Sequence, residues 1–151
     1  MSLEENKAII RRLFEILNKH NPALLDECYA PDYVNHTLQL RGLESLKQFE
    51  TEIYKGFPDW HETIEDIIAE GDRVCVRYKV TGTNTGEWSF SGITLAPTDK
   101  SITFTSVSIY RIVDGKVVEG WHVYDLLDFY KQLGIIEYTE KGKKLFPEDA
   151  K

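Results

Sequence analysis

The sequence predicts an α+β fold in which a strongly bent antiparallel sheet wraps around about three N-terminal helices. Apolar residues recur at helical spacing over residues 9–17, whereas apolar and polar residues alternate over residues 74–80. Helices and strands that are segregated along the chain are typical of the α+β class. A chain of 151 residues suits one domain with its own core. We expect a single domain over residues 1–151, with a core at 5–134 and a polar C-terminal tail at 135–151.

The first third of the chain predicts the helices. Residues 2–5 have the form of a capping box, in which a hydroxyl is followed three residues later by a carboxylate. Pro22 suits the first turn of a short second helix. Residues 33–36 read as a short extended piece, after which a third helix begins at Gly42 and ends at Pro58.

From Trp60 onward the pattern is that of strands separated by turns. Asp114-Gly115 is a strong hairpin signal between the last two strands, and Gly134 ends a closing helical turn. A sheet bent around the helices would leave a pocket, where small ligands tend to bind. Its outer face would stay partly apolar, which predicts a homodimer. We expect the strands at residues 60–69, 74–80, 87–95, 102–113 and 117–124.

The overall charge argues against several classes of partner. The net charge of -7 disfavours nucleic acids and anionic membranes, because both require a basic surface. No run approaches the ~18 apolar residues of a membrane-spanning helix. The histidines lack the spacing of metal ligands, so we expect no metal site. Cys28 and Cys75 are expected to be free thiols in a reducing compartment, which predicts a cytoplasmic protein.

Short motifs spread from about Glu5 to Gly134 are more specific together than alone. The motifs are Tyr33-Val34-Asn35-His36, Gly42 with the helix after it, Phe57-Pro58-Asp59, Glu70-Gly71-Asp72-Arg73-Val74, Gly82-Thr83-Asn84-Thr85-Gly86, Pro97-Thr98, Tyr110-Arg111-Ile112-Val113-Asp114-Gly115-Lys116, Glu119-Gly120-Trp121 followed by Asp125, and Gln132-Leu133-Gly134. Their order and spacing resemble the SnoaL-like polyketide cyclase family of the nuclear-transport-factor-2-like superfamily.

This resemblance implies a fold and a chemistry. The fold is a cone-shaped α+β barrel around a mostly apolar cavity. Characterised members close a ring in an aromatic polyketide by intramolecular aldol condensation, with no metal or organic cofactor. Their acid/base residue is the aspartate of the pattern Trp-x-x-x-Asp, which falls on Asp125. Family members commonly carry histidine in Gly-Thr-His-x-Gly, where this chain has Asn84, an amide that cannot carry a proton at neutral pH.

Asp125 has two interpretations on its own chemistry. On a strand it would share a face with Trp121, which would strip water from the carboxylate and raise its pKa. A carboxyl with a raised pKa can move protons near neutral pH. Alternatively, Asp125 is the N-cap of the last helix and accepts backbone N–H bonds, which would lower its pKa.

Further candidates surround this aspartate in the expected pocket. His36 could hydrogen-bond a substrate carbonyl or orient Asp125, or it could simply tie down its own loop. Asn35 and Asn84 are candidate polar contacts to a substrate, or ordinary turn residues. Three aromatic residues are candidates for the substrate-binding wall: Tyr33, Trp60 and Trp121.

Three functions are compatible with this sequence. The first is a cofactor-free enzyme that uses Asp125 and His36 on a small apolar carbonyl compound, by ring closure or isomerisation. The second is a non-catalytic module that binds a small hydrophobic molecule in the same pocket. The third is a hydrolase that activates water with paired carboxylates, which would require Glu119 or Asp128 as the second acid.

Overall fold

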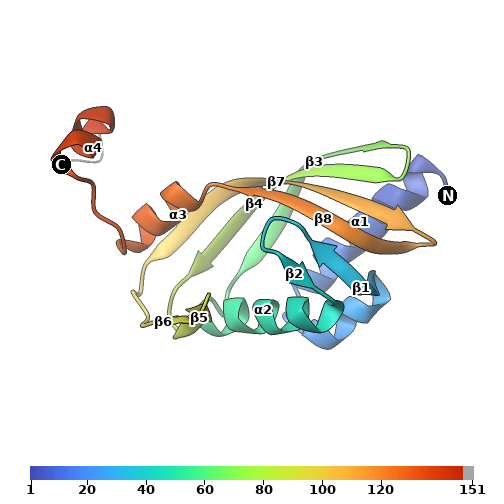
Figure 1. The fold of residues 1–151 in the computed structure, drawn as a ribbon, viewed down its shortest axis with the longest axis horizontal. Helices are drawn as coiled ribbons and strands as arrows, with labels where there is room; N and C mark the ends of the chain where they lie inside the picture. The colour runs from blue at the N-terminus through green and yellow to red at the C-terminus, as the bar shows by residue number, and fades with distance from the viewer. Residues whose placement is uncertain (148–151) are drawn as a thin grey trace.

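The computed structural model of the chain describes residues 1–147. Six strands form one curved sheet in the order β2-β1-β8-β7-β4-β3, and β5 and β6 form a separate hairpin. The sheet arches over α1 and α2, and α4 lies apart from it at the C-terminal end (Figure 1). The elements are α1 (Leu3–Leu17), η1 (Pro22–Glu27), β1 (Tyr29–Asn35), β2 (Leu40–Arg41), α2 (Leu43–Gly56), β3 (His61–Glu70), β4 (Arg73–Thr83), β5 (Trp88–Phe90), β6 (Ile93–Leu95), β7 (Ser101–Val113), β8 (Lys116–Tyr124), α3 (Leu126–Leu133) and α4 (Glu140–Leu145).

The α+β class is therefore confirmed, but the sheet is mixed and stays open. Strand β1 pairs in parallel with β8, whereas the other neighbouring strands of the sheet are antiparallel. A parallel pair requires a long connection, and here nearly the whole chain separates the two strands. Local alternation reveals a strand but not its distant partner, so the sequence alone could not show this pairing.

Helix α1 closes one side of the core. The capping box at its start is present, since the Glu5 amide donates to Ser2 Oγ at 3.1 Å and the Ser2 amide donates to Glu5 Oε2 at 2.6 Å. Ile10 and Leu13 are fully buried, and the ring of Phe14 meets that of Tyr78 on β4 edge-to-face. The helix thus packs the apolar stripe that its spacing predicts against the inner face of the sheet.

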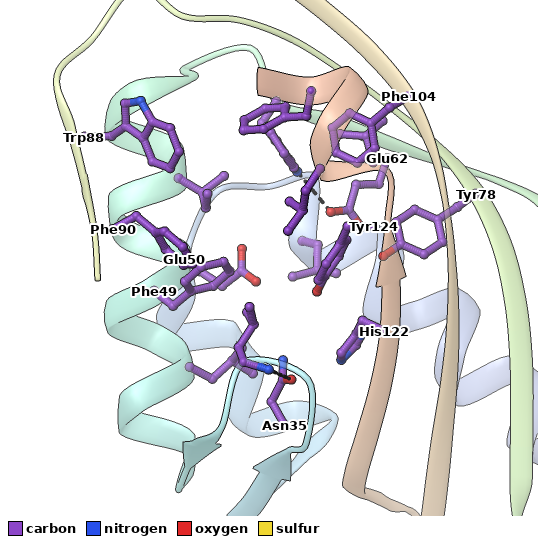
Figure 2. A pocket seen from close by; sticks show the side chains of 18 of the residues that line it. Asn35, Phe49, Glu50, Glu62, Tyr78, Trp88, Phe90, Phe104, His122 and Tyr124 are labelled. Atoms are coloured by element: carbon purple, nitrogen blue, oxygen red, sulfur yellow. Dashed lines mark hydrogen bonds between the residues drawn. The ribbon is translucent and has the colours of Figure 1, made fainter. Parts of the chain in front are cut away.

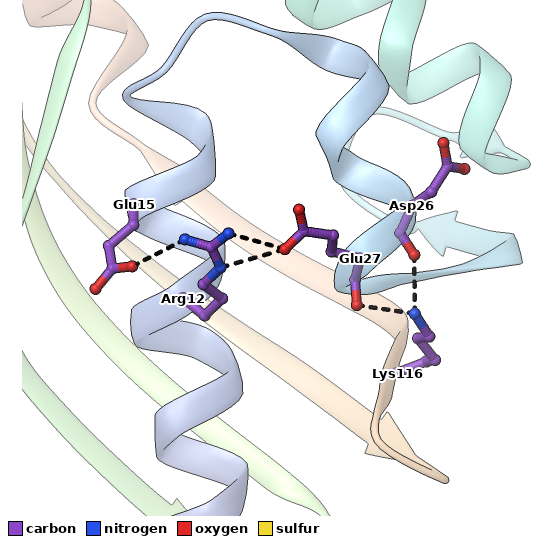
Figure 3. A network of polar contacts seen from close by, with 5 residues as sticks. All are labelled: Arg12, Glu15, Asp26, Glu27 and Lys116. Carbon is purple, nitrogen blue, oxygen red and sulfur yellow. Dashed lines mark hydrogen bonds and ion pairs between the residues drawn. The ribbon is translucent and has the colours of Figure 1, made fainter.

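A set of charged side chains fastens η1 between α1 and β8 (Figure 3). Arg12 on α1 donates to the carboxylates of Glu15 and Glu27. Lys116, at the start of β8, donates to the backbone carbonyls of Asp26 and Glu27, at 2.8 Å each. The last carbonyls of a helix have no partner within it, so Lys116 supplies one and fixes where β1 begins.

Two strands show which face of the sheet is the core. Val74, Val76, Tyr78 and Val80 on β4 are buried, while the residues that alternate with them turn outward. Strand β7 alternates in the same way along its whole length. The Asp114-Gly115 hairpin is present, with φ of 49° and 76° as a type I′ turn requires.

Some boundaries differ from the expectation. The second helix is a short 3-10 helix, and the expected strand at residues 87–95 divides into β5 and β6 at Ser91-Gly92, where φ is positive at both residues. The tail carries α4, which buries none of its residues. Cys28 and Cys75 are free thiols. No helix within residues 1–147 is long and apolar enough to cross a membrane.

Candidate active site

A cavity opens between α2 and the concave face of the sheet (Figure 2). It leaves about 100 Å³ for the centres of water-sized spheres, several times what one water molecule requires. Aromatic side chains make up most of its wall, so a planar apolar ligand would be well packed. These aromatic residues are Tyr29, Tyr33, Phe49, Trp60, Tyr78, Trp88, Phe90, Phe104, Tyr110, Tyr124, Phe129 and Tyr130.

Two carboxyl groups project into this cavity, Glu50 from α2 and Glu62 from β3 (Figure 2). Each keeps some accessible surface, and both line the cavity. Burial raises the pKa of Glu50 to about 8, with a further contribution from the charge of Glu62. Burial also raises the pKa of Glu62 to about 7. Near neutral pH the pair therefore holds both an ionised and a protonated carboxyl.

The orientation of Glu62 is fixed by its neighbours. Trp60 Nε1 donates to Glu62 Oε1 at 2.9 Å. The side chain of Asn18, the C-cap of α1, makes two hydrogen bonds with the Glu62 backbone: it accepts from the amide and donates to the carbonyl, at 2.8 Å each. A carboxylate held in this way is placed for proton transfer to a bound molecule.

His122 lies on the cavity wall within a chain of hydroxyl groups. Its Nδ1 is 2.7 Å from Ser108 Oγ, which is 3.1 Å from the Tyr78 hydroxyl. Its Nε2 is 3.3 Å from the Tyr33 hydroxyl. Burial lowers the pKa of His122 to about 4, so the imidazole is neutral at physiological pH. A neutral imidazole has one donor and one acceptor nitrogen, which matches a partner on each side.

Asn35 supplies a polar contact at the end of the cavity nearest β1. The residue is 2% exposed, and its Oδ1 accepts the backbone amides of Thr37 and Leu38 at 3.1 and 2.9 Å. Its Nδ2 has no hydrogen-bond partner within residues 1–147. Figure 2 shows this side chain below the two carboxyl groups, at the edge of the same cavity. The amide is thus a donor available to a ligand oxygen.

Comparison with known proteins agrees with this arrangement of cavity and sheet. The sequence model of the SnoaL-like polyketide cyclases matches residues 7–133. The chain belongs to the SnoaL-like polyketide cyclase family. A comparison with curated proteins finds no match.

Solved structures with the same nuclear-transport-factor-2-like fold include TsrD from Streptomyces laurentii, at 23% identity and a TM-score of 0.79 over 90% of this chain and 99% of that one. AclR from Streptomyces galilaeus, provisionally described as a hydroxylase, is 27% identical with a TM-score of 0.78 over 99% and 94% of the two chains. IdmH from Streptomyces antibioticus, provisionally described as a polyketide cyclase, is 28% identical with a TM-score of 0.72 over 85% and 98%.

Asp125, the residue that the resemblance suggested as the acid/base group, does not line the cavity. Asp125 is exposed and is the N-cap of α3, where its Oδ1 accepts the amide of Asp128 at 3.2 Å. Of the two interpretations of Asp125, the N-cap of the last helix is therefore confirmed, and the desolvated carboxyl is wrong. Strand β8 ends at Tyr124, so Asp125 belongs to the cap of the next helix and no longer follows the alternation of the strand.

Trp121 and His36 were expected in the cavity, but both lie on the outer face of the sheet. His122 and Tyr124 take inner positions of β8, so Trp121 and Val123, which alternate with them along the strand, point outward. The rings of His36 and Trp121 stack with centroids 4.8 Å apart, and the Arg73 guanidinium lies 5.1 Å from the centroid of the Trp121 ring. A strand has two faces, and the sequence alone suggested the wrong one here.

Asn84 is a structural residue that does not line the cavity. It is fully buried, and its Nδ2 donates to the carbonyls of Gly56 and Gly86 at 3.1 and 3.0 Å. Its Oδ1 accepts the backbone amide and the hydroxyl of Thr98 at 2.9 and 3.0 Å. With these bonds the amide has no capacity left for a substrate. The remaining candidates, Tyr33, Asn35 and Trp60, do line the cavity.

Three cavity residues were missed by the sequence reasoning, although each had a signal. Glu50 stands four residues after Leu46 and three before Ile53, on the apolar stripe of its helix. Glu62 is two residues after Trp60, and His122 is two residues before Tyr124, so each shares a strand face with an aromatic residue. In each case the unused signal was a polar residue on an otherwise apolar face.

Proposed function

We propose that this family member is a cofactor-free acid/base enzyme that acts on a small apolar carbonyl compound, by aldol ring closure or isomerisation. The observation that carries the proposal is the pair of carboxyls, Glu50 and Glu62, in an aromatic cavity that raises the pKa of both. One carboxyl can accept a proton and the other can donate one at the same pH. The similarity to IdmH, provisionally a polyketide cyclase, supports the same class of reaction.

The reaction begins with proton removal beside a carbonyl. The ionised carboxylate of Glu62 takes a proton from the carbon next to the carbonyl, and the electrons of that C–H bond form an enolate. Asn35 Nδ2–H donates to the developing oxyanion, and this hydrogen bond strengthens as negative charge builds up. Tyr33 and Trp60 form part of the wall that holds the substrate and excludes water.

The protonated partner completes the reaction. In ring closure, the enolate carbon attacks a second carbonyl of the same molecule and forms the new C–C bond. The resulting alkoxide takes the proton of the Glu50 carboxyl. In isomerisation, the substrate carries a β,γ double bond, the enolate is a conjugated dienolate, and Glu62 returns the proton to its γ-carbon while the double bond moves into conjugation with the carbonyl. No group outside the cavity is needed to balance either sequence.

A non-catalytic binding module is the second candidate. Asp125, at the position of the family's acid/base residue, is exposed, which favours a member that has kept the cavity and lost the family's reaction. In that case the two glutamates would serve recognition alone.

Exchange of carbon-bound protons separates the two candidates. β-Tetralone, a small apolar ketone, is incubated with the protein in D2O, and loss of the α-proton signal is followed by NMR. We expect exchange above the buffer rate for the wild type and none for the Glu50→Gln/Glu62→Gln double variant. The matched control, Glu44→Gln/Glu70→Gln, changes an exposed glutamate on each of the same two elements. Exchange at the buffer rate with wild type would reject the enzyme in favour of the binding module.

We further propose that the protein is a cytoplasmic homodimer. Val107, Ile109 and Val123 leave apolar surface exposed on the outer face of the sheet, which a second copy would cover. The free thiols of Cys28 and Cys75 are compatible with a reducing compartment. Sedimentation equilibrium tests the assembly: a monomer mass, or a dimer unaffected by Val123→Glu, would reject this interface.

A further inference from the structure

The cavity is acidic as well as aromatic. Of the residues that line it, none is a lysine or an arginine, and its histidine, His122, is neutral at physiological pH. The ionisable groups of the wall that can become charged near neutral pH are therefore Glu50 and Glu62. A ligand that fills the cavity meets negative charge and aromatic rings but no cationic side chain.

A second observation shows that the cavity is prepared for a polar ligand. Asn35 is buried, and its Nδ2 faces the cavity without a partner among the described residues. The Nδ2 atom keeps accessible surface in the cavity, so it can form a hydrogen bond with a group that enters there. A ligand oxygen would satisfy it. The required ligand thus has an acceptor oxygen at the Asn35 end of the cavity.

We propose that the substrate of this cavity is an amine: an aromatic carbonyl compound whose protonated amino group pairs with Glu50 and Glu62 while its carbonyl oxygen accepts from Asn35. This inference rests on the proposed function, since the carbonyl is the group on which that reaction acts, and it narrows the substrate from an apolar carbonyl compound to one that also carries an ammonium group. An organic cation suits the site better than a bare ion, because aromatic rings attract ammonium groups through their faces and bury the rest of the molecule.

The same charge distribution excludes anions. A substrate with a carboxylate would place a third acid beside Glu50 and Glu62, with no cation to compensate. Binding of the ammonium has the opposite effect, because a nearby positive charge favours ionised carboxylates. The pKa of each glutamate falls, and protons that the two carboxyls hold near neutral pH are released. One glutamate then pairs with the ammonium and the other is left ionised as the base, so with an amine substrate the alkoxide of ring closure takes back the proton that this base removed from carbon.

Calorimetry with three matched ligands tests this proposal. Naphthylethylamine, naphthylethanol and naphthylacetate share one ring system and carry positive, zero and negative charge at about pH 7.5. We expect the amine to bind roughly tenfold more tightly than the alcohol, and the acetate to bind most weakly. In buffers of different ionisation enthalpy, the amine should release protons and the alcohol should not.

Variants assign the preference to the two glutamates. In Glu50→Gln/Glu62→Gln the preference for the amine should disappear while the alcohol binds as before, and Glu44→Gln/Glu70→Gln should keep it. An alcohol that binds as tightly as the amine, an acetate that binds best, binding of none of the three, or a preference that survives in the double variant would each overturn the proposal.

The exchange assay on the same preparations separates this inference from the proposed function. If the protein exchanges the α-protons of β-tetralone but shows no preference for the amine, the amine proposal is rejected and the proposed acid/base function stands. A preference for the amine without exchange supports recognition of the cation and rejects catalysis. The comparison of amine with alcohol needs wild-type protein alone, so it decides the question even where a variant fails to fold.

Discussion

The two faces of the sheet carry the same kinds of side chain, but the pKa of the glutamate is raised on one face and lowered on the other. Each has a glutamate close to a tryptophan, and each has a histidine. On the concave face, Glu62 accepts a hydrogen bond from the neutral indole of Trp60 and meets no cation in the cavity. Burial raises its pKa to about 7, and burial keeps His122 of the same wall neutral.

On the convex face, Glu119 is paired with a cation. Arg111 Nε donates to Glu119 Oε2 at 2.7 Å, and His36 Nε2 lies 3.5 Å from Glu119 Oε1. The hydrogen bond from Arg111, together with its charge, lowers the pKa of Glu119. His36 is stacked on Trp121 and remains partly exposed. The residue types are shared, so burial and the charge of the partner decide which glutamate can move protons near neutral pH.

The largest expected effect is on activity. Glu62→Gln should reduce α-proton exchange by about 100-fold, as expected for loss of a general base. Glu119→Gln on the opposite face should change it by less than about twofold, because Glu119 does not line the cavity. The rates are measured by NMR in D2O under identical conditions. Equal losses from the two substitutions would remove the distinction between the faces.

The next effect is on stability as a function of pH. Glu50 and Glu62 have an ordinary pKa of 4.5, which rises to about 8 and about 7 in the folded chain. Between pH 4.5 and about 8 the folded state therefore binds more protons than the unfolded state. Stability should therefore fall as pH rises. The lowered pKa of His122 acts in the opposite direction only between about 4 and 6.5.

Urea unfolding at about pH 6.5 and about pH 9 measures this dependence. We expect the wild type to lose about 2 kcal/mol more than Glu50→Gln/Glu62→Gln over this interval, after allowance for water in the cavity. Parallel curves for the two proteins would show that the carboxyls are not desolvated.

A smaller effect is expected at the end of β8. Asp125→Ala should cost about 1 kcal/mol of stability, since it removes the N-cap of α3. Asp125→Asn should cost less, because an amide oxygen can still accept the Asp128 amide. Neither substitution should slow exchange. A loss of exchange in Asp125→Asn with unchanged stability would return the catalytic role to Asp125.

The smallest effect belongs to the outer ion pair. Glu119→Gln should lower stability slightly, because Glu119 and Arg111 are both partly exposed and water screens their attraction. The loss should vanish at about 1 M salt, where the screening length is short. Unfolding curves at low and high salt check this, and a loss that persists at high salt would mean that Glu119 acts through packing.

Much of the fold was readable from local pattern. Spacing predicted α1 and α2, alternation predicted β4 and β7, the turns between strands predicted β3 and β8, and Asp114-Gly115 predicted the last hairpin. The site was less accessible to sequence reasoning. Tyr33, Asn35 and Trp60 line the cavity, whereas Asp125, the candidate acid/base residue, is the N-cap of α3.

The sequence by itself determined where helices and strands form, because propensity, capping and periodicity act over a few neighbouring residues. It also placed Glu50 and Glu62 on otherwise apolar faces. Only the tertiary structure decided that β1 lies parallel to β8, which face of β8 looks inward, and that α2 and β3 bring their two glutamates into one cavity. Those facts depend on contacts between residues far apart in the chain, and desolvation of a carboxyl exists only once such contacts have excluded water.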